Sequence, residues 1–351
     1  MLALAAAVAP LDARLVERWY STGVYPFVQR VVTPVSNLVP FAWFDVFTVG
    51  AAAIVIAIVV RRVVRAPRKT RWRHALGATA NLVTAAAVIY LLFLVAWGFN
   101  YRRVPMMERL VVDRGAPSSD AVLALGLTAA GELNGLYSAA HAAGWRTAPW
   151  RDHGLSQAYA DVQRLLSDGT PSVPGRLKSS IYGPYFRWAS VDGMVNPFGL
   201  EVIGNPDLLP FELPFVAAHE WAHLAGYADE SEASFVGWLT CVRAAAPGAY
   251  SGWLFLYWQI NSEVGPADRK RLSTALAEGP RRDIAAIAAR LQRGQVPALR
   301  DASWKVYDRY LKANRVEQGI RSYGAVVTLL LRARFEDGWR PVRREVDRSQ
   351  Q

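Results

Sequence analysis

The sequence contains almost no cysteine. Cys241 is the only one among 351 residues, which excludes an internal disulfide and a cysteine-based zinc site. The chain also lacks repeats, low-complexity segments and any recognisable nucleic-acid-binding module. Its 40 basic residues exceed its 29 acidic ones, but seven of the basic residues fall in residues 61–73, which contain no acid. We therefore predict no nucleic-acid partner, although a basic excess often indicates one.

Charge is missing from two long stretches. Residues 40–60 carry only Asp45, and residues 75–101 carry no charged side chain. About 20 apolar residues cross a bilayer, so we predict two transmembrane helices within residues 40–101; the alternative is a pair of buried core helices. Cytoplasmic loops of membrane proteins are enriched in Lys and Arg, so the basic loop at residues 61–73 is predicted to be cytoplasmic.

The start of the chain lacks the features of a cleaved secretion signal. Residues 2–9 are apolar, but they have no basic start and are too short to span a bilayer. They are either the end of a truncated span or an ordinary N-terminal arm. We treat residues 1–39 as an N-terminal segment that continues, from residue 12, as an extramembrane or interfacial link. Residues 102–351 would then form an extracytoplasmic domain.

Helical periodicity dominates this domain. Residues 177–205 differ, because they are rich in Gly, Pro, Asn and aromatic residues and predict short strands. We expect a mainly α fold with a small β element. The strand region is our candidate for pairing with an extended substrate, and a hairpin without a substrate role is the alternative. Apolar spacing predicts helices at residues 118–145 (which Asn134-Gly135 could divide in two), 155–167, 250–260, 267–293, 304–313 and 322–334.

The most informative stretch is PFVAAHEWAHLAGYADESEAS, residues 214–234. His219, Glu220 and His223 form H-E-x-x-H, the pattern of zinc peptidases. Residues four apart share a helix face, so both imidazoles can bind one metal ion. Glu220 can reach a metal-bound water without being a ligand itself. Gly226 is placed to end this helix in a left-handed turn.

A catalytic zinc ion needs a third protein ligand and an open position for water. Three acids near the start of the next helix are candidates. Glu230 matches the Glu of the E-x-x-A-D helix of gluzincins, with Ser234 in the place of the Asp. Glu232 is the second choice, and Asp229, at a metzincin-like spacing, is the third. The remaining histidines have no partner at helical spacing and are not expected to bind metal: His74, His141 and His153.

These residues predict a membrane-anchored metalloendopeptidase with one zinc ion and a peptide or protein substrate. Glu220 would accept a proton from the zinc-activated water and pass it to the leaving amine. The oxyanion donor stays open among Tyr182, Tyr185, Asn196 and Tyr323. Two alternatives remain: a non-catalytic membrane scaffold or sensor with a structural zinc, and a zinc hydrolase of a cell-envelope amide.

Several segments resemble an uncharacterised family of bacterial membrane proteins, a domain of unknown function. The resemblance implies a zincin-like domain of gluzincin type with two or three spans, in the bacterial cell membrane, with the catalytic domain outside the cytoplasm. It also implies that Asn196, Pro197 and Phe198 bind substrate, because their segment is similar to the strand beside the cleft of membrane gluzincins. The segments are VERWYSTGVYPFVQR (16–30), LVPFAWFDV (38–46), WGFNYRR (97–103), VNPFGLEV (195–202), LPFVAAHEWAHLAGYADESEASFVGWL (213–239) and YLKANRVEQGIRSYG (310–324).

Overall fold

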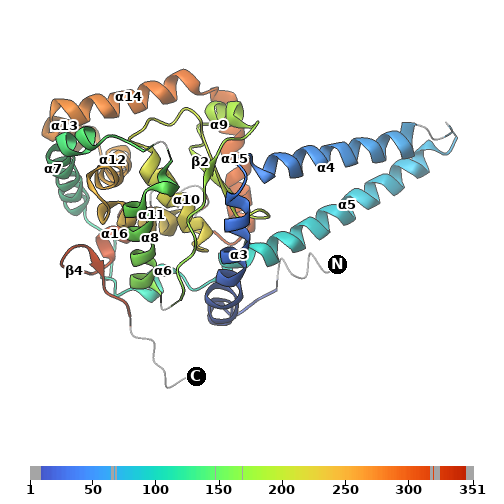
Figure 1. Cartoon of the computed structure of the whole chain (residues 1–351), viewed down its shortest axis with the longest axis horizontal. Coiled ribbons are helices and arrows are strands. Elements are labelled where there is room, and N and C mark those ends of the chain that lie inside the picture. The colour runs from blue at the N-terminus through green and yellow to red at the C-terminus, as the bar shows by residue number, and fades with distance from the viewer. Residues whose placement is uncertain are drawn as a thin grey trace.

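The chain folds into a rounded helical domain from which two long helices project as an antiparallel pair (Figure 1). The computed structural model describes residues 9–64, 67, 69–146, 148–167, 169–316, 319 and 325–344. The expected mainly α fold with a small β element is confirmed, because the described residues are mostly helical and hold two small sheets.

The projecting helices are the two stretches of low charge. α4 (Trp43–Val59) continues through the π-helical η2 (Val60–Val64), and α5 (Arg71–Ala96) returns to the domain. The most apolar stretch of the first helix has a mean hydropathy of 2.3, and that of the second has a mean hydropathy of 2.1. None of the first stretch and only 17% of the second is buried. Core helices would be buried. The chain thus has two helices long and apolar enough to span a membrane, and the alternative of two core helices is wrong.

The N-terminal segment is helical where a link was expected. α2 (Ala13–Leu15), η1 (Val16–Val24) and α3 (Tyr25–Asn37) follow one another without a break. Pro26 does not stop the chain of helices, because it falls in the first turn of α3, where π-helical geometry gives way to α-helical geometry. Residues 1–8, which hold most of the apolar run at the start, lie outside the described residues.

Two expected features of the domain helices are corrected. Residues 118–145 form one helix, α7 (Ser119–Ala143), and Asn134 uses its side chain to bind Ala275 O and Ala277 N. These two residues flank the turn between α13 (Pro266–Ala275) and α14 (Glu278–Gly294), so the predicted helix 267–293 is two helices. The remaining helices of the domain are η3 (Gly98–Arg102), α6 (Met106–Arg109), η4 (Pro149–Arg151), α8 (His153–Leu166), α9 (Gly183–Ala189), α10 (Leu213–Leu224), α11 (Glu230–Val242), α12 (Ala246–Glu263), α15 (Pro297–Ala313) and α16 (Ala325–Arg332).

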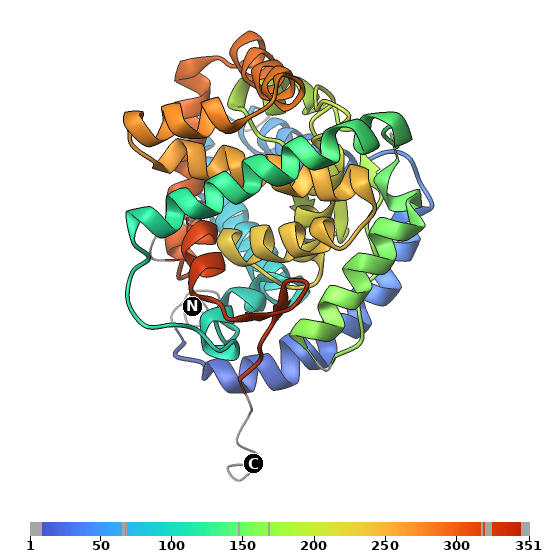
Figure 2. The same ribbon diagram turned by 90° about the vertical axis from the view of Figure 1, so that its left-hand side faces the viewer.

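The core lies between α10, α11 and α12, with α7 packed along α12 (Figure 2). Trp221 of α10 and Trp238 of α11 are completely buried. α12 contains the predicted helix at residues 250–260, and its buried Tyr250 and Leu256 make this apolar run part of the core. Burial of such large side chains is the main source of stability in a domain of this kind.

The principal sheet has three short strands in the order β1-β3-β2. β1 (Leu177–Lys178) runs parallel to the central β3 (Glu201–Gly204), and β2 (Gly193–Asn196) is antiparallel to β3. The strands predicted within residues 177–205 are therefore present, but α9 between them was not predicted. β2 forms an edge of the sheet in the described structure and packs against α10. A second sheet pairs β4 (Phe335–Glu336) with β5 (Arg340–Pro341) near the C-terminus.

Candidate metal centre

The H-E-x-x-H residues lie on a buried helix with well-defined ends. Pro214 occupies the first turn of α10, where its missing N–H is tolerated. Gly226 follows the helix with a φ of +84°, a left-handed conformation that ends it as the sequence predicts. His219 and His223 are one turn apart, so their imidazoles lie on the same face of α10, with ring centroids 4.8 Å apart.

The start of α11 brings a carboxylate to this pair. Asp229 is the N-cap of α11 and accepts hydrogen bonds from the backbone N–H of Ser231 and Glu232. Glu230 is therefore the first helical residue, and its Oε2 lies 3.3 Å from His219 Nε2 and 3.4 Å from His223 Nε2. The three potential ligand atoms all lie within 4.8 Å of one another.

These distances fit a tetrahedral zinc ion. Two ligand atoms that are each about 2.0–2.1 Å from a tetrahedral zinc ion lie about 3.3–3.4 Å apart. Both imidazole contacts of Glu230 have this length. Glu230 Oε2 is also buried without a hydrogen bond of ordinary geometry, which a metal ion would compensate. Two imidazoles and one carboxylate are a donor set that zinc commonly uses in hydrolases.

The other two candidate acids are engaged elsewhere. The side chain of Asp229 is used in capping α11. Glu232 contacts α6 instead: its Oε1 accepts a hydrogen bond of 2.5 Å from Met106 N, and its Oε2 lies 3.9 Å from Arg109. The structure thus brings Glu230, and neither Asp229 nor Glu232, to the two histidines.

Both imidazoles are oriented by contacts of their second nitrogen. His223 Nδ1 lies 2.7 Å from the carbonyl oxygen of Tyr227, which accepts a hydrogen bond from Nδ1–H, so that Nε2 is the nitrogen that can bind a metal ion. His219 Nδ1 lies 3.3 Å from the hydroxyl of Ser234, which follows Glu230 by about one turn of α11. Trp97 holds the backbone of His223 through a 2.9 Å hydrogen bond from its indole N–H.

Glu220 is a buried carboxylate directly beside this cluster. Its Oε2 has no hydrogen-bond partner among the described residues. Its Oε1 lies against Gly193 of β2, where an added Cβ atom would come within 2.6 Å of it. Burial raises the pKa of Glu220, although the two imidazoles oppose the rise. A carboxyl with a raised pKa and a free oxygen is suited to accept and return a proton.

The histidines and Glu230 are electrostatically complementary. Burial disfavours the charged form of Glu230, but the nearby imidazoles outweigh this effect and hold its pKa below the ordinary value. Burial likewise disfavours the imidazolium of His223, and the carboxylate of Glu230 outweighs it and raises the pKa of His223. A divalent cation bound between the imidazoles and Glu230 would replace the protons that the Glu230 carboxylate attracts to the imidazoles.

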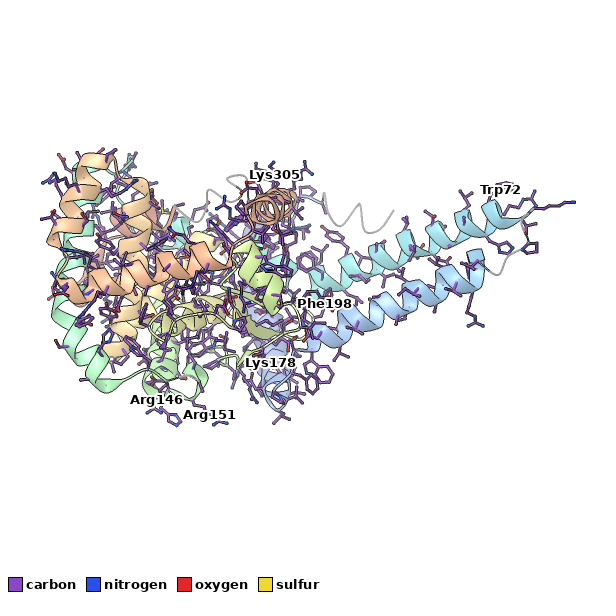
Figure 3. All side chains as sticks on the ribbon, turned by 90° about the horizontal axis from the view of Figure 1, so that it is seen from above. Trp72, Arg146, Arg151, Lys178, Phe198 and Lys305 are labelled. Atoms are coloured by element: carbon purple, nitrogen blue, oxygen red, sulfur yellow. The ribbon has the colours of Figure 1, made fainter. Side chains whose placement is uncertain are left out.

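The remaining predicted site residues that the structure describes make their contacts elsewhere. Tyr185 donates to Ser303 Oγ at 3.0 Å, and the ring of Tyr182 packs on Phe44. The amide of Asn196 donates to Glu201 at 2.9 Å and accepts from Phe198 N. Phe198 lies at the base of the projecting helices (Figure 3). Pro197 belongs to the turn between β2 and β3, and Tyr323 lies outside the described residues.

Three residues at the site were not predicted. Tyr307 of α15 donates its hydroxyl proton to Glu230 Oε1, the oxygen that does not face the histidines. Gly193 makes room for Glu220, and Trp97 supports His223. Tyr307 and Trp97 are 77 and 126 positions from their partners, so no local spacing could indicate them.

A family model described as "Protein of unknown function (DUF3810)" matches residues 20–331. This range includes the whole candidate metal centre and both projecting helices. No curated protein and no solved structure matches the chain.

Proposed function

Because the chain belongs to the DUF3810 family of unknown function, we propose its activity from the site itself: a membrane-anchored zinc metallopeptidase of gluzincin type. The observation that carries this proposal is the combination of three convergent candidate ligands, one of them a carboxylate, with a second carboxylate, that of Glu220, beside them. Among the described residues, His219, His223 and Glu230 are the one group with metal-binding geometry. Three protein ligands leave a position open, as in catalytic zinc sites, whereas structural sites use four.

Each residue of the site has a defined task in peptide hydrolysis. His219, His223 and Glu230 would hold the zinc ion. When bound, zinc supplies a Lewis acid that polarises a carbonyl and acidifies water. Glu220 accepts the proton of the attacking water at its free oxygen and returns it to the leaving nitrogen. Tyr307 fixes the orientation of the Glu230 carboxylate.

The edge strand β2 is the candidate site for the peptide. It packs against α10, and its first residue, Gly193, touches Glu220. An extended peptide can add to such an edge through main-chain hydrogen bonds, which places its backbone beside the catalytic carboxylate. This assignment moves the proposed substrate contacts from Asn196, Pro197 and Phe198 to residues 193–195 of β2, because the side chain of Asn196 is bound to Glu201.

The two apolar helices would anchor the enzyme in a bilayer. The basic loop at residues 61–73 favours the cytoplasmic side for the tip of the helix pair. The domain with the metal centre would then lie outside the cytoplasm. Proteolysis of intact spheroplasts tests this topology: the domain should be digested from outside, whereas protection of the domain would reverse the orientation.

Metal analysis of three charge-neutralising variants tests the site. We expect the full-length chain, stripped with a chelator and reloaded, to hold one zinc ion. Glu230→Gln should lose it, whereas Glu232→Gln and Asp229→Asn should keep it, because their side chains are used in other contacts. Circular dichroism of each variant separates loss of metal from loss of fold. Full zinc content in a folded Glu230→Gln variant would remove Glu230 from the ligand set.

Turnover of a library of internally quenched peptides tests the activity. Glu220→Gln should keep zinc and lose activity by about 10²–10⁴-fold, the range for a general base. Glu278→Gln is the matched control, since Glu278 is an exposed acid of α14. Hydrolysis of cell-envelope amides in place of peptides would change the substrate class. Wild-type activity in Glu220→Gln would contradict the mechanism.

A further inference from the structure

The helical segment from Leu15 to Leu38 turns apolar side chains outward. Its large exposed hydrophobic residues recur at helical spacing, and Phe27 and Leu38 are 72% and 80% exposed. A surface helix of a soluble domain directs such residues into the core, so this side of the helix is built for a partner. We call the following set the apolar stripe: Leu15, Trp19, Val24, Phe27, Val31, Val35 and Leu38.

The opposite side of the same helix is polar and buried against the domain. Gln29 exchanges two hydrogen bonds with Val173, donating to its carbonyl at 2.7 Å and accepting from its N–H at 2.9 Å. Thr33 donates to Leu200 O at 2.8 Å. These bonds fix which side of the helix faces the domain, so the outward position of the apolar stripe is specified and not a result of loose packing.

The apolar stripe is continuous with the surface of the projecting helices. Leu38 is followed by the exposed Phe41 and then by Trp43, the first residue of α4. α3 crosses the direction of α4 and α5, and it lies at the end of the domain from which they project (Figure 1). The view along the projecting helices shows the same segment following the rim of the domain (Figure 2). The surface of a bilayer that surrounds α4 and α5 would therefore lie beside α3.

Charge along the segment favours a lipid surface over a second protein copy. Arg14, Arg18 and Arg30 are exposed next to the apolar stripe. The one acid of the segment from Ala13 to Asn37, Glu17, is held inward by Arg103 at 2.7 Å. Two copies of this face would bring like charges together, whereas anionic lipid phosphates complement exposed guanidinium groups.

We propose that residues 13–38 form an in-plane membrane helix that docks on an anionic bilayer. The apolar stripe lies in the boundary between head groups and acyl chains, about 5–10 Å deep, and the arginines reach the phosphates. The partner is the lipid bilayer that α4 and α5 enter. This docking adds a second contact with the membrane that is independent of catalysis.

Contacts of the strand β2 with the start of α4 limit the distance between the metal centre and the bilayer. β2 leads from Gly193, beside Glu220, to Asn196, which binds Glu201. Glu201 in turn accepts the N–H groups of Trp43 and Phe44 at the start of α4. Four residues of strand cover only about 10 Å. The centre is thereby held close to the lipid surface.

Fluorescence from the full-length chain in lipid nanodiscs tests this proposal. Phe27→Cys and Val31→Cys are labelled with an environment-sensitive dye, in discs of phosphatidylcholine and phosphatidylglycerol. Cys241 is fully buried and serves as the unlabelled background. Leu127→Cys is the matched control, because Leu127 is an exposed apolar residue of α7. α7 lies on the side of the domain opposite the projecting helices (Figure 1).

We expect blue-shifted emission at positions 27 and 31, with loss of most of it when the lipids carry a nitroxide near the head group. Position 127 should show neither effect. Emission at 27 and 31 equal to that at 127 would overturn the proposal. A blue shift that nitroxide lipids do not quench, and that disappears on dilution with empty discs, would also overturn it, because a second protein copy would then cover the stripe.

Discussion

The hydroxyl of Tyr25 donates a 2.7 Å hydrogen bond to the carbonyl oxygen of Leu224, the last residue of α10. This bond joins the N-terminal helix to the helix that carries His219 and His223. Arg103 makes a second link, since it binds Glu17 and also donates to Gly226 O at 2.9 Å. The end of α10 is thus held by two residues that are 199 and 123 positions from their partners in sequence.

Tyr25→Phe should destabilise the protein by about 1–3 kcal/mol, because it leaves a buried carbonyl without a partner. Thermal unfolding of the zinc-loaded chain in detergent measures the loss. Tyr185→Phe is the matched control, as it removes an exposed hydroxyl bound to Ser303 and should change stability by less than about 0.5 kcal/mol. Equal melting temperatures for the two variants would show that the Tyr25 bond contributes nothing.

Gly193→Ala should separate metal binding from turnover. The added Cβ would come within 2.6 Å of Glu220 Oε1 and within 3.0 Å of its carboxyl carbon, so Glu220 must move. The three heavy atoms nearest to the added Cβ all belong to Glu220 and none to a candidate ligand, so zinc content should stay that of the wild type. Peptide hydrolysis should fall about 10²-fold or more, since the proposed general base is displaced.

Gly131→Ala is the control for Gly193→Ala. Gly131 lies within α7, and a Cβ atom there meets nothing within 4 Å. Alanine should therefore leave activity unchanged and stabilise the helix by about 0.5–1 kcal/mol. Normal turnover in Gly193→Ala would mean that Glu220 does not need its present position against β2.

The sequence predicts the histidine pair well, because H-E-x-x-H depends only on the geometry of one helix. Which acid is the third candidate ligand is harder to predict from the sequence. Asp229, Glu230 and Glu232 stand within four residues, and one position along a helix turns a side chain by about 100°. The choice depends on where α11 begins, and Asp229 determines this by capping. Ser and Asp are both good N-caps, so the sequence alone does not show at which residue α11 begins, and hence which acid faces the histidines.

Other parts of the fold could not be predicted from local patterns. The exposed apolar residues of η1 and α3 have helical spacing, but Pro26 and Pro34 made an irregular link the simpler interpretation. Tyr307 comes to Glu230 through the packing of α15, which depends on contacts with α9. The division between α13 and α14, by contrast, has a local signal that the prediction overlooked, Pro280 in the first turn of α14, and Asn134 binds both sides of the turn. Tertiary contacts decided the position of Tyr307.

Tyr307→Phe should weaken zinc binding and leave the fold intact. Loss of the hydroxyl frees Glu230 Oε1, so the carboxylate no longer has a fixed orientation toward the histidines. Partners of this kind typically change metal affinity by about 10–100-fold. Competition with a chromophoric chelator measures the change in the dissociation constant.

Tyr185→Phe is the appropriate comparison for Tyr307→Phe, because Tyr185 also binds α15, through Ser303, but lies apart from the candidate ligands. We expect its zinc affinity to equal that of the wild type. If both variants lose affinity equally, then α15 stabilises the site as a whole, and the hydroxyl of Tyr307 has no individual role.

A buried ion pair predicts how stability depends on pH. Lys178 and Glu201 are completely buried and 2.7 Å apart, and Glu201 also accepts bonds from Asn196 and from the start of α4. Burial raises the pKa of Glu201, but the bonds from Lys178, Asn196 and the two N–H groups outweigh it and hold the pKa below 4.5. The unfolded chain therefore binds this proton more tightly than the folded chain does.

The sign of the effect follows from this difference. The contribution of Glu201 to stability is fully present above a pH of about 4.5 and is lost as the pH falls below it. In Glu201→Gln this acid-dependent loss should disappear. The variant should also be less stable at neutral pH by about 3–5 kcal/mol, because the Lys178 ammonium is left buried and unpaired. Thermal unfolding at several pH values, in detergent, measures both effects.

A double variant, Lys178→Met with Glu201→Gln, distinguishes charge from packing. It removes both charges, so we expect it to recover most of the neutral-pH stability that Glu201→Gln alone loses. Its stability should show the same weak dependence on acid as the single variant. If the double variant is as unstable as Glu201→Gln, the loss comes from the N–H groups of Trp43 and Phe44, because a neutral amide cannot accept both of their bonds as the carboxylate does. That result would assign the main role of Glu201 to fixing the start of α4 on the sheet, since the unpaired charge would then cost little.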